Sequence, residues 1–81
     1  VNVLNIVGIT YFQFNIVDKA LYLLEEAFRL DSKNTDTIYN ICYVLHQINE
    51  NKLALEFINN ISIAEDDLEL HQLKHQIEEA V

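Results

Sequence analysis

The 81-residue sequence contains no proline and a single glycine, Gly8. Folds rich in β-turns use both residues often, so this composition disfavours them and suits helices joined by short loops. Methionine is also absent, even at position 1. The chain is therefore expected to be a piece of a longer protein.

Basic residues and cysteine are scarce as well. Five lysines and arginines stand against thirteen aspartates and glutamates, which gives a net charge of −8. This charge repels phosphate backbones and anionic lipid surfaces, so neither nucleic acid nor a membrane is expected as a partner. A partner with basic character would be attracted; alternatively, the acidity only keeps the protein soluble. The one cysteine, Cys42, cannot form an internal disulfide, which indicates a reducing, cytoplasmic location.

The sequence offers little chemistry for catalysis. One glycine cannot build a glycine-rich phosphate loop, and the carboxylates fall on predicted solvent-facing sides or helix ends. Cys42 has no basic neighbour in the sequence that would lower its pKa, so we interpret it as a packing residue. We expect neither enzymatic activity nor a cofactor.

Two histidines near the end of the chain are the only candidate metal ligands. His71 and His75 are four residues apart, and Asp67 and Glu78 extend the same face of a predicted helix, which is a ligand set that zinc can use. The pair lacks the glutamate of a His-Glu-x-x-His motif. A solvated helix face is therefore the preferred interpretation, and a metal-dependent role is a distant third hypothesis. His46 is expected to line a surface.

Hydrophobic periodicity predicts an all-α domain of about five helices. The expected helices are residues 2–14, 18–30, 35–48 and 52–61, and a last one that begins at a capping box (62–65) or at Asp66 and Asp67. Asn15 and Asn49 are expected to end the first and third helices, because asparagine tolerates a left-handed backbone conformation. Asn34 or Thr35 is expected to cap the third helix.

Each of the first two helices has an apolar stripe that we expect to be buried. In the first helix the spacing i, i+3, i+4, i+7 picks out Leu4, Val7, Gly8 and Tyr11. In the second helix the stripe consists of Ala20, Leu23, Leu24, Ala27 and Leu30. The small residues in these stripes indicate places where two helix axes approach closely.

The two halves of the chain repeat each other. A single shift of the sequence along itself aligns Gln13 with Gln47, Asn15 with Asn49, Ala20 with Ala54, and Leu21 with Leu55. Apolar positions also align with apolar ones. A period of about 34 residues with a helix–turn–helix in each unit is the signature of the tetratricopeptide repeat (TPR).

The chain resembles the TPR family along its whole length. The resemblance divides it into repeat one (1–34), repeat two (35–68) and a terminal capping helix (69–81). Gly8, Ala20 and Ala27 match the small positions of the family directly, whereas repeat two departs more, with Cys42 in place of glycine or alanine. The implied fold is a single domain of antiparallel helix hairpins stacked as a short right-handed superhelix.

In TPR proteins the first helix of each repeat lines a concave face that receives peptides or partner helices. Transferred residue by residue, this implies a partner-binding surface from two helices. The first contributes Asn2, Asn5, Ile6, Ile9, Phe12 and Gln13, and the second contributes Asp36, Tyr39, Asn40, Tyr43, His46 and Gln47. Aromatic rings supply contact area and amides pair with a peptide backbone. We therefore expect a non-enzymatic module that binds a protein or peptide.

Alternatives to this groove remain open at this point. A grip on a C-terminal carboxylate, as in chaperone-binding relatives, is not expected, because Asn5 and Ile9 do not supply the required charge and amide. The apolar residues of the first helix are alternatively covered by upstream sequence or by a second copy, which would make a homodimer. The runner-up function is a C-terminal TPR appendage that docks or dimerises a larger enzyme. Asparagine- and isoleucine-rich repeats of this kind resemble those that follow the catalytic domain of some bacterial glycosyltransferases.

Overall fold

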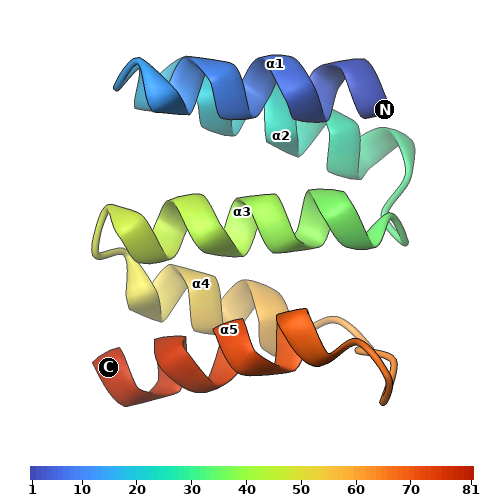
Figure 1. The fold of residues 1–81 in the computed structure, drawn as a ribbon, viewed down its shortest axis with the longest axis vertical. Coiled ribbons are helices and arrows are strands. Elements are labelled where there is room, and N and C mark those ends of the chain that lie inside the picture. The colour runs from blue at the N-terminus through green and yellow to red at the C-terminus, as the bar shows by residue number, and fades with distance from the viewer.

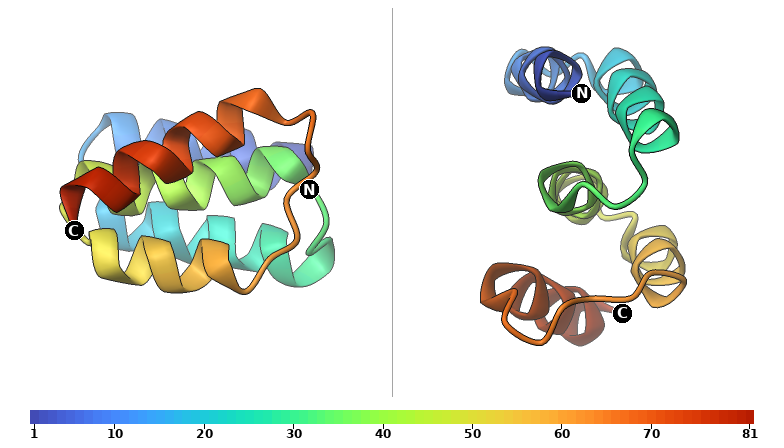
Figure 2. Two further views of the ribbon diagram at one scale, coloured as in Figure 1. Left: turned by 90° about the horizontal axis from the view of Figure 1, so that it is seen from below. Right: turned by 90° about the vertical axis from the view of Figure 1, so that its right-hand side faces the viewer.

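The computed structural model describes residues 1–81 and consists of five α-helices with no strand (Figure 1). The helices are α1 (Asn2–Gln13), α2 (Val17–Leu30), α3 (Thr35–Gln47), α4 (Asn51–Asn59) and α5 (Leu68–Ala80). An end-on view shows two layers, with α1, α3 and α5 in one and α2 and α4 in the other (Figure 2). The prediction of an all-α fold with about five helices is confirmed.

The internal repeat of the sequence recurs in the backbone. α1 ends at Gln13 and α3 ends at Gln47, and the asparagine that follows each, Asn15 or Asn49, has a φ of 63°. The chain turns back through equivalent bonds: the Ile16 amide donates to the Tyr11 carbonyl at 2.9 Å, and the Glu50 amide donates to the Leu45 carbonyl at 2.8 Å. The prediction that asparagine ends both helices in a left-handed conformation is confirmed.

Side-chain caps begin the first helix of the second hairpin and the last helix. The side-chain oxygen of Asn34 accepts a bond from the Thr37 amide at 3.1 Å, and the Asp67 carboxylate accepts one from the Leu70 amide at 3.2 Å. Of the predicted alternatives, Asn34 and Asp67 are therefore the caps, and the capping box at 62–65 is not formed.

α4 is shorter than predicted. It ends at Asn59 rather than Ile61, because the Asn60 side chain donates a 2.8 Å bond to the Glu56 carbonyl and closes the last turn. Ile61 instead lies in the connection 60–67, where it packs against the core between α3, α4 and α5.

The core lies mainly between the later helices. Its larger cluster joins α3, α4 and α5 through Ile38, Cys42, Ala54, Ile58, Leu70, Leu73 and Ile77. A smaller cluster of Leu24, Ile41 and Val44 joins α2 to α3. α1 reaches α2 through Gly8, where a Cβ atom would lie 3.0 Å from the Leu24 Cγ and 3.4 Å from the Ala20 carbonyl oxygen. A larger residue there would press on the Leu24 side chain, because the two helices approach so closely.

The predicted buried stripes are partly wrong. Gly8, Ala20, Leu24 and Ala27 are buried, but Leu30 is exposed at the end of α2 and Val7 is exposed on α1. Compared with the predicted orientation, α1 is turned about its own axis so that Asn5 and Gly8, rather than Val7, face the other helices. A buried hydrogen bond from Asn5, described below, accounts for this rotation.

Every helix contacts only helices that are one or two places away along the chain. The most distant pairs in contact are α1 with α3, α3 with α5, and α2 with α4, the last through the rings of Phe28 and Phe57. No helix combines the length and the apolar character needed to cross a bilayer.

The stacked helices present one long face made by α1, α3 and α5, in which α3 is set back between its two neighbours (Figure 2).

Candidate functional site

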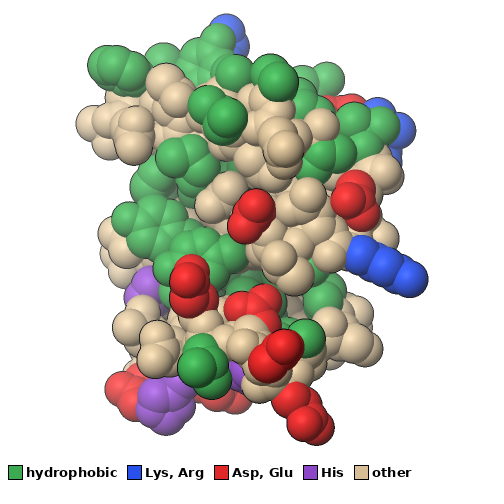
Figure 3. Space-filling view, turned by 45° about the vertical axis from the view of Figure 1, so that its right-hand side comes forward, with side chains coloured by type: hydrophobic (Ala, Val, Ile, Leu, Met, Phe, Trp, Pro, Cys, Tyr) green, Lys and Arg blue, Asp and Glu red, His purple; other side chains and the backbone are tan.

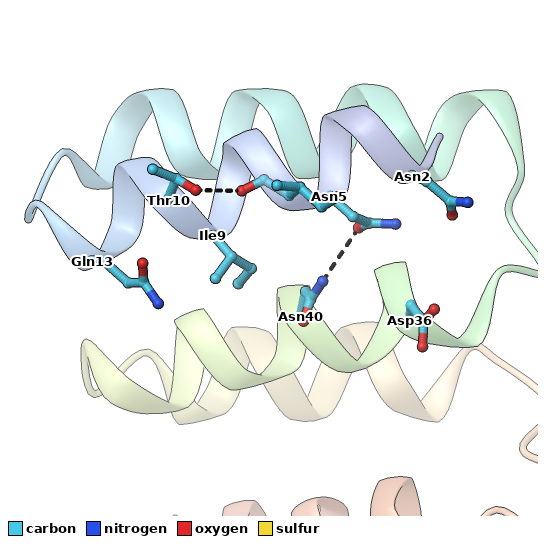
Figure 4. Close-up of a pocket in the computed structure, with 8 residues that line it drawn as sticks. Asn2, Asn5, Ile9, Thr10, Gln13, Asp36 and Asn40 are labelled. Carbon is cyan, nitrogen blue, oxygen red and sulfur yellow. Dashed lines mark hydrogen bonds between the residues drawn. The ribbon is translucent and has the colours of Figure 1, made fainter.

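A groove with a volume of about 620 Å³ runs between α1 and α3 (Figure 4). It is lined by Asn2, Asn5, Ile6, Ile9, Thr10, Gln13, Asp36 and Asn40. All of these except Thr10 belong to the concave face predicted from the sequence. Two isoleucines supply its apolar surface, and amide or hydroxyl side chains supply most of the rest.

Asn5 is the most buried residue of this groove. Its side-chain Nδ2 donates a 2.8 Å hydrogen bond to the Oγ1 of Thr37, and its Oδ1 accepts a 3.3 Å bond from the Nδ2 of Asn40 (Figure 4). The amide of Asn5 is thus engaged inside the protein, and the residue forms the floor of the groove. Asn40 uses one N–H of its NH₂ group for this contact, so its second N–H and its Oδ1 are left to pair with a ligand.

This polar contact is fully satisfied although it is buried. Asn5 and Thr37 are both removed from solvent, and no buried side-chain nitrogen or oxygen in the structure lacks a hydrogen-bond partner. Burial of a polar group is costly unless it is bonded. The contact therefore holds α1 in a defined position on α3 and keeps the two walls of the groove apart by a fixed distance.

Three predicted aromatic residues lie beside the groove instead of lining it. The Phe12 and Tyr43 rings meet edge to face with centroids 6.1 Å apart, and Tyr39 stacks on Tyr43 at 6.2 Å. Phe12 and Tyr43 also pack against the Leu24 cluster. These rings form a continuous half-buried strip that supports α1 on α3.

The last two predicted residues lie beyond the groove at the C-terminal end of α3. The Nδ1 of His46 is 2.6 Å from the Oδ1 of Asn51, the first residue of α4. Gln47 is exposed at the helix end. The twelve residues of the predicted partner-binding surface therefore divide into three groups. Asn2, Asn5, Ile6, Ile9, Gln13, Asp36 and Asn40 line the groove, Phe12, Tyr39 and Tyr43 form the aromatic strip, and His46 and Gln47 lie outside both.

The charges of the molecule are segregated. The segment 1–17 contains no aspartate, glutamate, lysine or arginine, whereas all thirteen acidic residues follow it. Hydrophobic side chains gather at the surface over the α1 end, and acidic ones lie over α3 to α5 (Figure 3). The only charged side chain that lines the groove is Asp36, in the first turn of α3.

The residues considered for chemistry are all occupied in other ways. Cys42 is fully buried, and burial raises the pKa of its thiol from 9.0 to about 12. The thiolate, which is the reactive form, is therefore not populated at neutral pH. This agrees with the interpretation of Cys42 as a packing residue.

The two histidines of α5 are engaged separately. His71 lies with its Nε2 3.0 Å from the Ala64 carbonyl oxygen, and His75 lies 2.6 Å from a Glu79 carboxylate oxygen. Asp67 is the helix cap. The structure contains no group of three or more histidine, cysteine, aspartate or glutamate side chains positioned to hold a metal ion.

Comparison of the chain with protein-family models, with curated proteins and with solved structures finds no match. The class of protein is defined by the fold alone: a short all-α array in which two helical hairpins and a further helix are stacked in series. Any function must be inferred from the groove and from the surfaces that the array exposes.

Proposed function

We propose that this chain is a TPR-like, non-enzymatic interaction module that binds a peptide or a helical segment of a partner protein between α1 and α3. The observation that carries the proposal is the groove itself, whose volume of about 620 Å³ falls in the range usual for ligand sites, about 300–1,000 Å³. The backbone repetition at Asn15 and Asn49 supports the TPR-like architecture.

The lining suits a polypeptide ligand better than a charged small molecule. Ile6 and Ile9 offer an apolar strip, while Gln13 and Asn2 are exposed and their amides have no bond within the protein. The Thr10 hydroxyl donates to the Ile6 carbonyl at 2.8 Å, so it can only accept a further bond. Apolar area flanked by free amides matches alternating side chains and backbone groups of a bound segment.

Charge favours a segment with basic residues. Asp36 lies in the groove and the chain as a whole carries a net charge of −8. A lysine or arginine of the ligand would be drawn toward Asp36 and the acidic surface over α3 to α5. We place such a partner in the cytoplasm, where an unpaired cysteine stays reduced.

The alternative role, an appendage that docks or dimerises a larger bacterial enzyme such as a glycosyltransferase, would use the same groove on a segment of that enzyme. The exposed apolar residues on α1 favour it, because a tail that is joined to a catalytic domain needs a surface to hold against it.

A displayed library of random peptides, each long enough to span the groove, tests the proposal. Selected peptides should be enriched in lysine or arginine beside aliphatic residues, and ¹⁵N NMR titration should shift the resonances of Ile9, Gln13 and Asn40. Ile6→Asp should weaken binding by about tenfold, since it places a carboxylate on the apolar strip. Leu53→Asp is the matched control, because Leu53 is an exposed apolar residue of α4 outside the groove.

Two results would contradict groove binding. One is a selection that yields no peptide with a dissociation constant below about 1 mM. The other is a set of NMR shifts that maps to α2 and α4 and responds to Leu53→Asp as strongly as to Ile6→Asp.

A further inference from the structure

One side of α1, extended by Phe14 just after it, carries a mostly apolar set of residues that are exposed to solvent. Val3, Val7, Thr10 and Phe14 are spaced i, i+4, i+7 and i+11, so they share one face of the helix. Val3 is 71% exposed, Val7 is 38% exposed and Phe14 is 73% exposed. We call these four residues the end face, because α1 lies at one end of the helix array (Figure 1).

The internal repeat shows what such a face does elsewhere in the same molecule. The equivalent residues of the second repeat, on and just after α3, are Thr37, Ile41, Val44 and Ile48. Thr37 and Val44 are 0% exposed and Ile41 is 4% exposed, because α1 and α2 cover them. The same stripe on α1 is equally apolar yet uncovered. It therefore has the composition of a helix–helix contact without the second helix.

Charge indicates which kind of surface can cover it. The segment 1–17 carries no charged side chain, in a chain whose net charge is −8. Two copies of this protein repel each other through almost any other surface, since like charges oppose association. At the α1 end, whose visible surface is mainly hydrophobic (Figure 3), two copies can meet through a segment that carries no carboxylate.

We propose that the end face is a homodimer interface in which α1 of one copy packs antiparallel on α1 of a second copy about a two-fold axis. This surface shares only Thr10 with the groove, and the proposal does not depend on peptide binding. An antiparallel arrangement makes the stripe complementary to itself. Val3 lies opposite Phe14 of the second copy and Val7 lies opposite its Thr10, so a small residue faces a large one at both ends.

A head-to-tail arrangement is disfavoured by the opposite end of the molecule. The helix at that end, α5, exposes Glu69, Glu78 and Glu79. Packing the end face against these residues would bury carboxylates next to valine and phenylalanine, which is costly. Closed pairs, rather than open chains of molecules, are the expected assembly.

Sedimentation equilibrium over a wide concentration range tests the proposal. A reversible monomer–dimer equilibrium is expected, with no higher species. Raising the salt concentration from about 0.05 M to about 0.5 M should tighten the dimer, because salt screens the repulsion between the two acidic bodies. A chain that stays strictly monomeric at millimolar concentration would overturn the proposal, as would a dimer that weakens when salt is added.

A pair of matched double variants locates the interface. Val3→Glu with Phe14→Glu should raise the dissociation constant by about tenfold or more, since both carboxylates would be buried unpaired. Tyr22→Glu with Leu68→Glu adds the same charge at exposed apolar residues elsewhere and should change it by less than about twofold. Circular dichroism on each variant separates loss of pairing from loss of folding. Equal effects of the two variants would overturn the location.

Cross-linking tests the two-fold axis. Thr10→Cys places a thiol near the centre of the proposed contact, and a short bis-maleimide should join two copies of this single variant. The native Cys42 is buried and its thiol has a pKa of about 12, so it does not compete for the reagent. Gln72→Cys on exposed α5 is the control. Cross-links that form only in a mixture of the two variants would indicate head-to-tail contact and overturn the proposal.

Discussion

The Asn5 side chain donates a 2.8 Å hydrogen bond to the Thr37 hydroxyl, and both residues are buried between α1 and α3. The two residues belong to different hairpins and are 32 positions apart in sequence. The bond therefore links the hairpins directly and also sets the width of the groove that we propose as the ligand site.

Removal of the Thr37 hydroxyl should destabilise the protein. Thr37→Val keeps the shape of the side chain but leaves the Asn5 Nδ2 buried without its partner, which should cost about 1–3 kcal/mol of unfolding free energy. Urea titration followed by circular dichroism measures this. Thr10→Val is the matched control, because Thr10 is exposed and its hydroxyl bonds only to its own helix; it should change stability by less than about 0.5 kcal/mol.

The bond between Asn5 and Thr37 also predicts energetic coupling between the two residues. If Asn5 and Thr37 stabilise the structure through each other, the double variant Asn5→Leu with Thr37→Val should be more stable than the sum of the single effects implies, by about 1 kcal/mol. Strict additivity would show that the two side chains act independently.

Enlargement of Ala20 should disturb the contact of α1 with α2. Ala20 is fully buried, and its carbonyl oxygen lies within 3.4 Å of the position that a Cβ on Gly8 would take. Ala20→Leu should therefore cost about 1–3 kcal/mol through overpacking, a large share of the stability of a small domain. Ala64→Leu, at an exposed position in the connection 60–67, should leave the melting temperature unchanged within about 2 °C.

The left-handed asparagines predict opposite effects of two substitutions. At Asn15 and Asn49, where φ is 63°, alanine meets a steric penalty of about 1–2 kcal/mol, whereas glycine does not. Asn15→Ala should lower the unfolding free energy by about 1 kcal/mol, and Asn15→Gly should leave it level or raise it. The exposed helical residue Asn59 should show the reverse order, with glycine worse than alanine.

The buried thiol predicts a loss of stability in alkali. Folding raises the pKa of Cys42 from 9.0 to about 12, so the unfolded chain releases this proton at lower pH than the folded protein does. The contribution of the neutral Cys42 thiol to the free energy of unfolding is intact below pH 9. It declines as pH rises, by about 1.4 kcal/mol per pH unit between the unfolded and the folded pKa. Cys42→Ala should be less stable at pH 7 but should show a flatter decline from pH 9 to 10.5. Parallel slopes would contradict this assignment.

Local sequence signals predicted most of the fold. The internal repeat and the asparagines at 15 and 49 located the hairpins closely, because both signals depend on the chain near each position. The end of α4 was placed too late, since the prediction followed the apolar spacing to Ile61. It could not foresee that the Asn60 side chain bonds back to the Glu56 carbonyl.

The groove was harder to predict than the helices. The resemblance to TPR proteins pointed to α1 and α3, and seven of the twelve named residues line the groove between these helices. The inward rotation of α1 was missed, because a polar residue is normally expected to face solvent and the partner of Asn5 lies on another hairpin. The one available signal for this partner was Thr37, a polar residue at the position that the apolar Val3 takes in repeat one. A contact between residues far apart in the sequence can be recognised only when both partners, here Asn5 and Thr37, are considered together.

Because helices touch only helices that are one or two places away along the chain, no distant strand or helix has to be found before contacts can form. Topologies of this kind fold quickly, since little loop entropy is lost before the first stabilising contacts appear. During synthesis, α1 and α2 can close on each other before α3 to α5 leave the ribosome. The order of synthesis and the order of assembly can therefore coincide, one hairpin at a time.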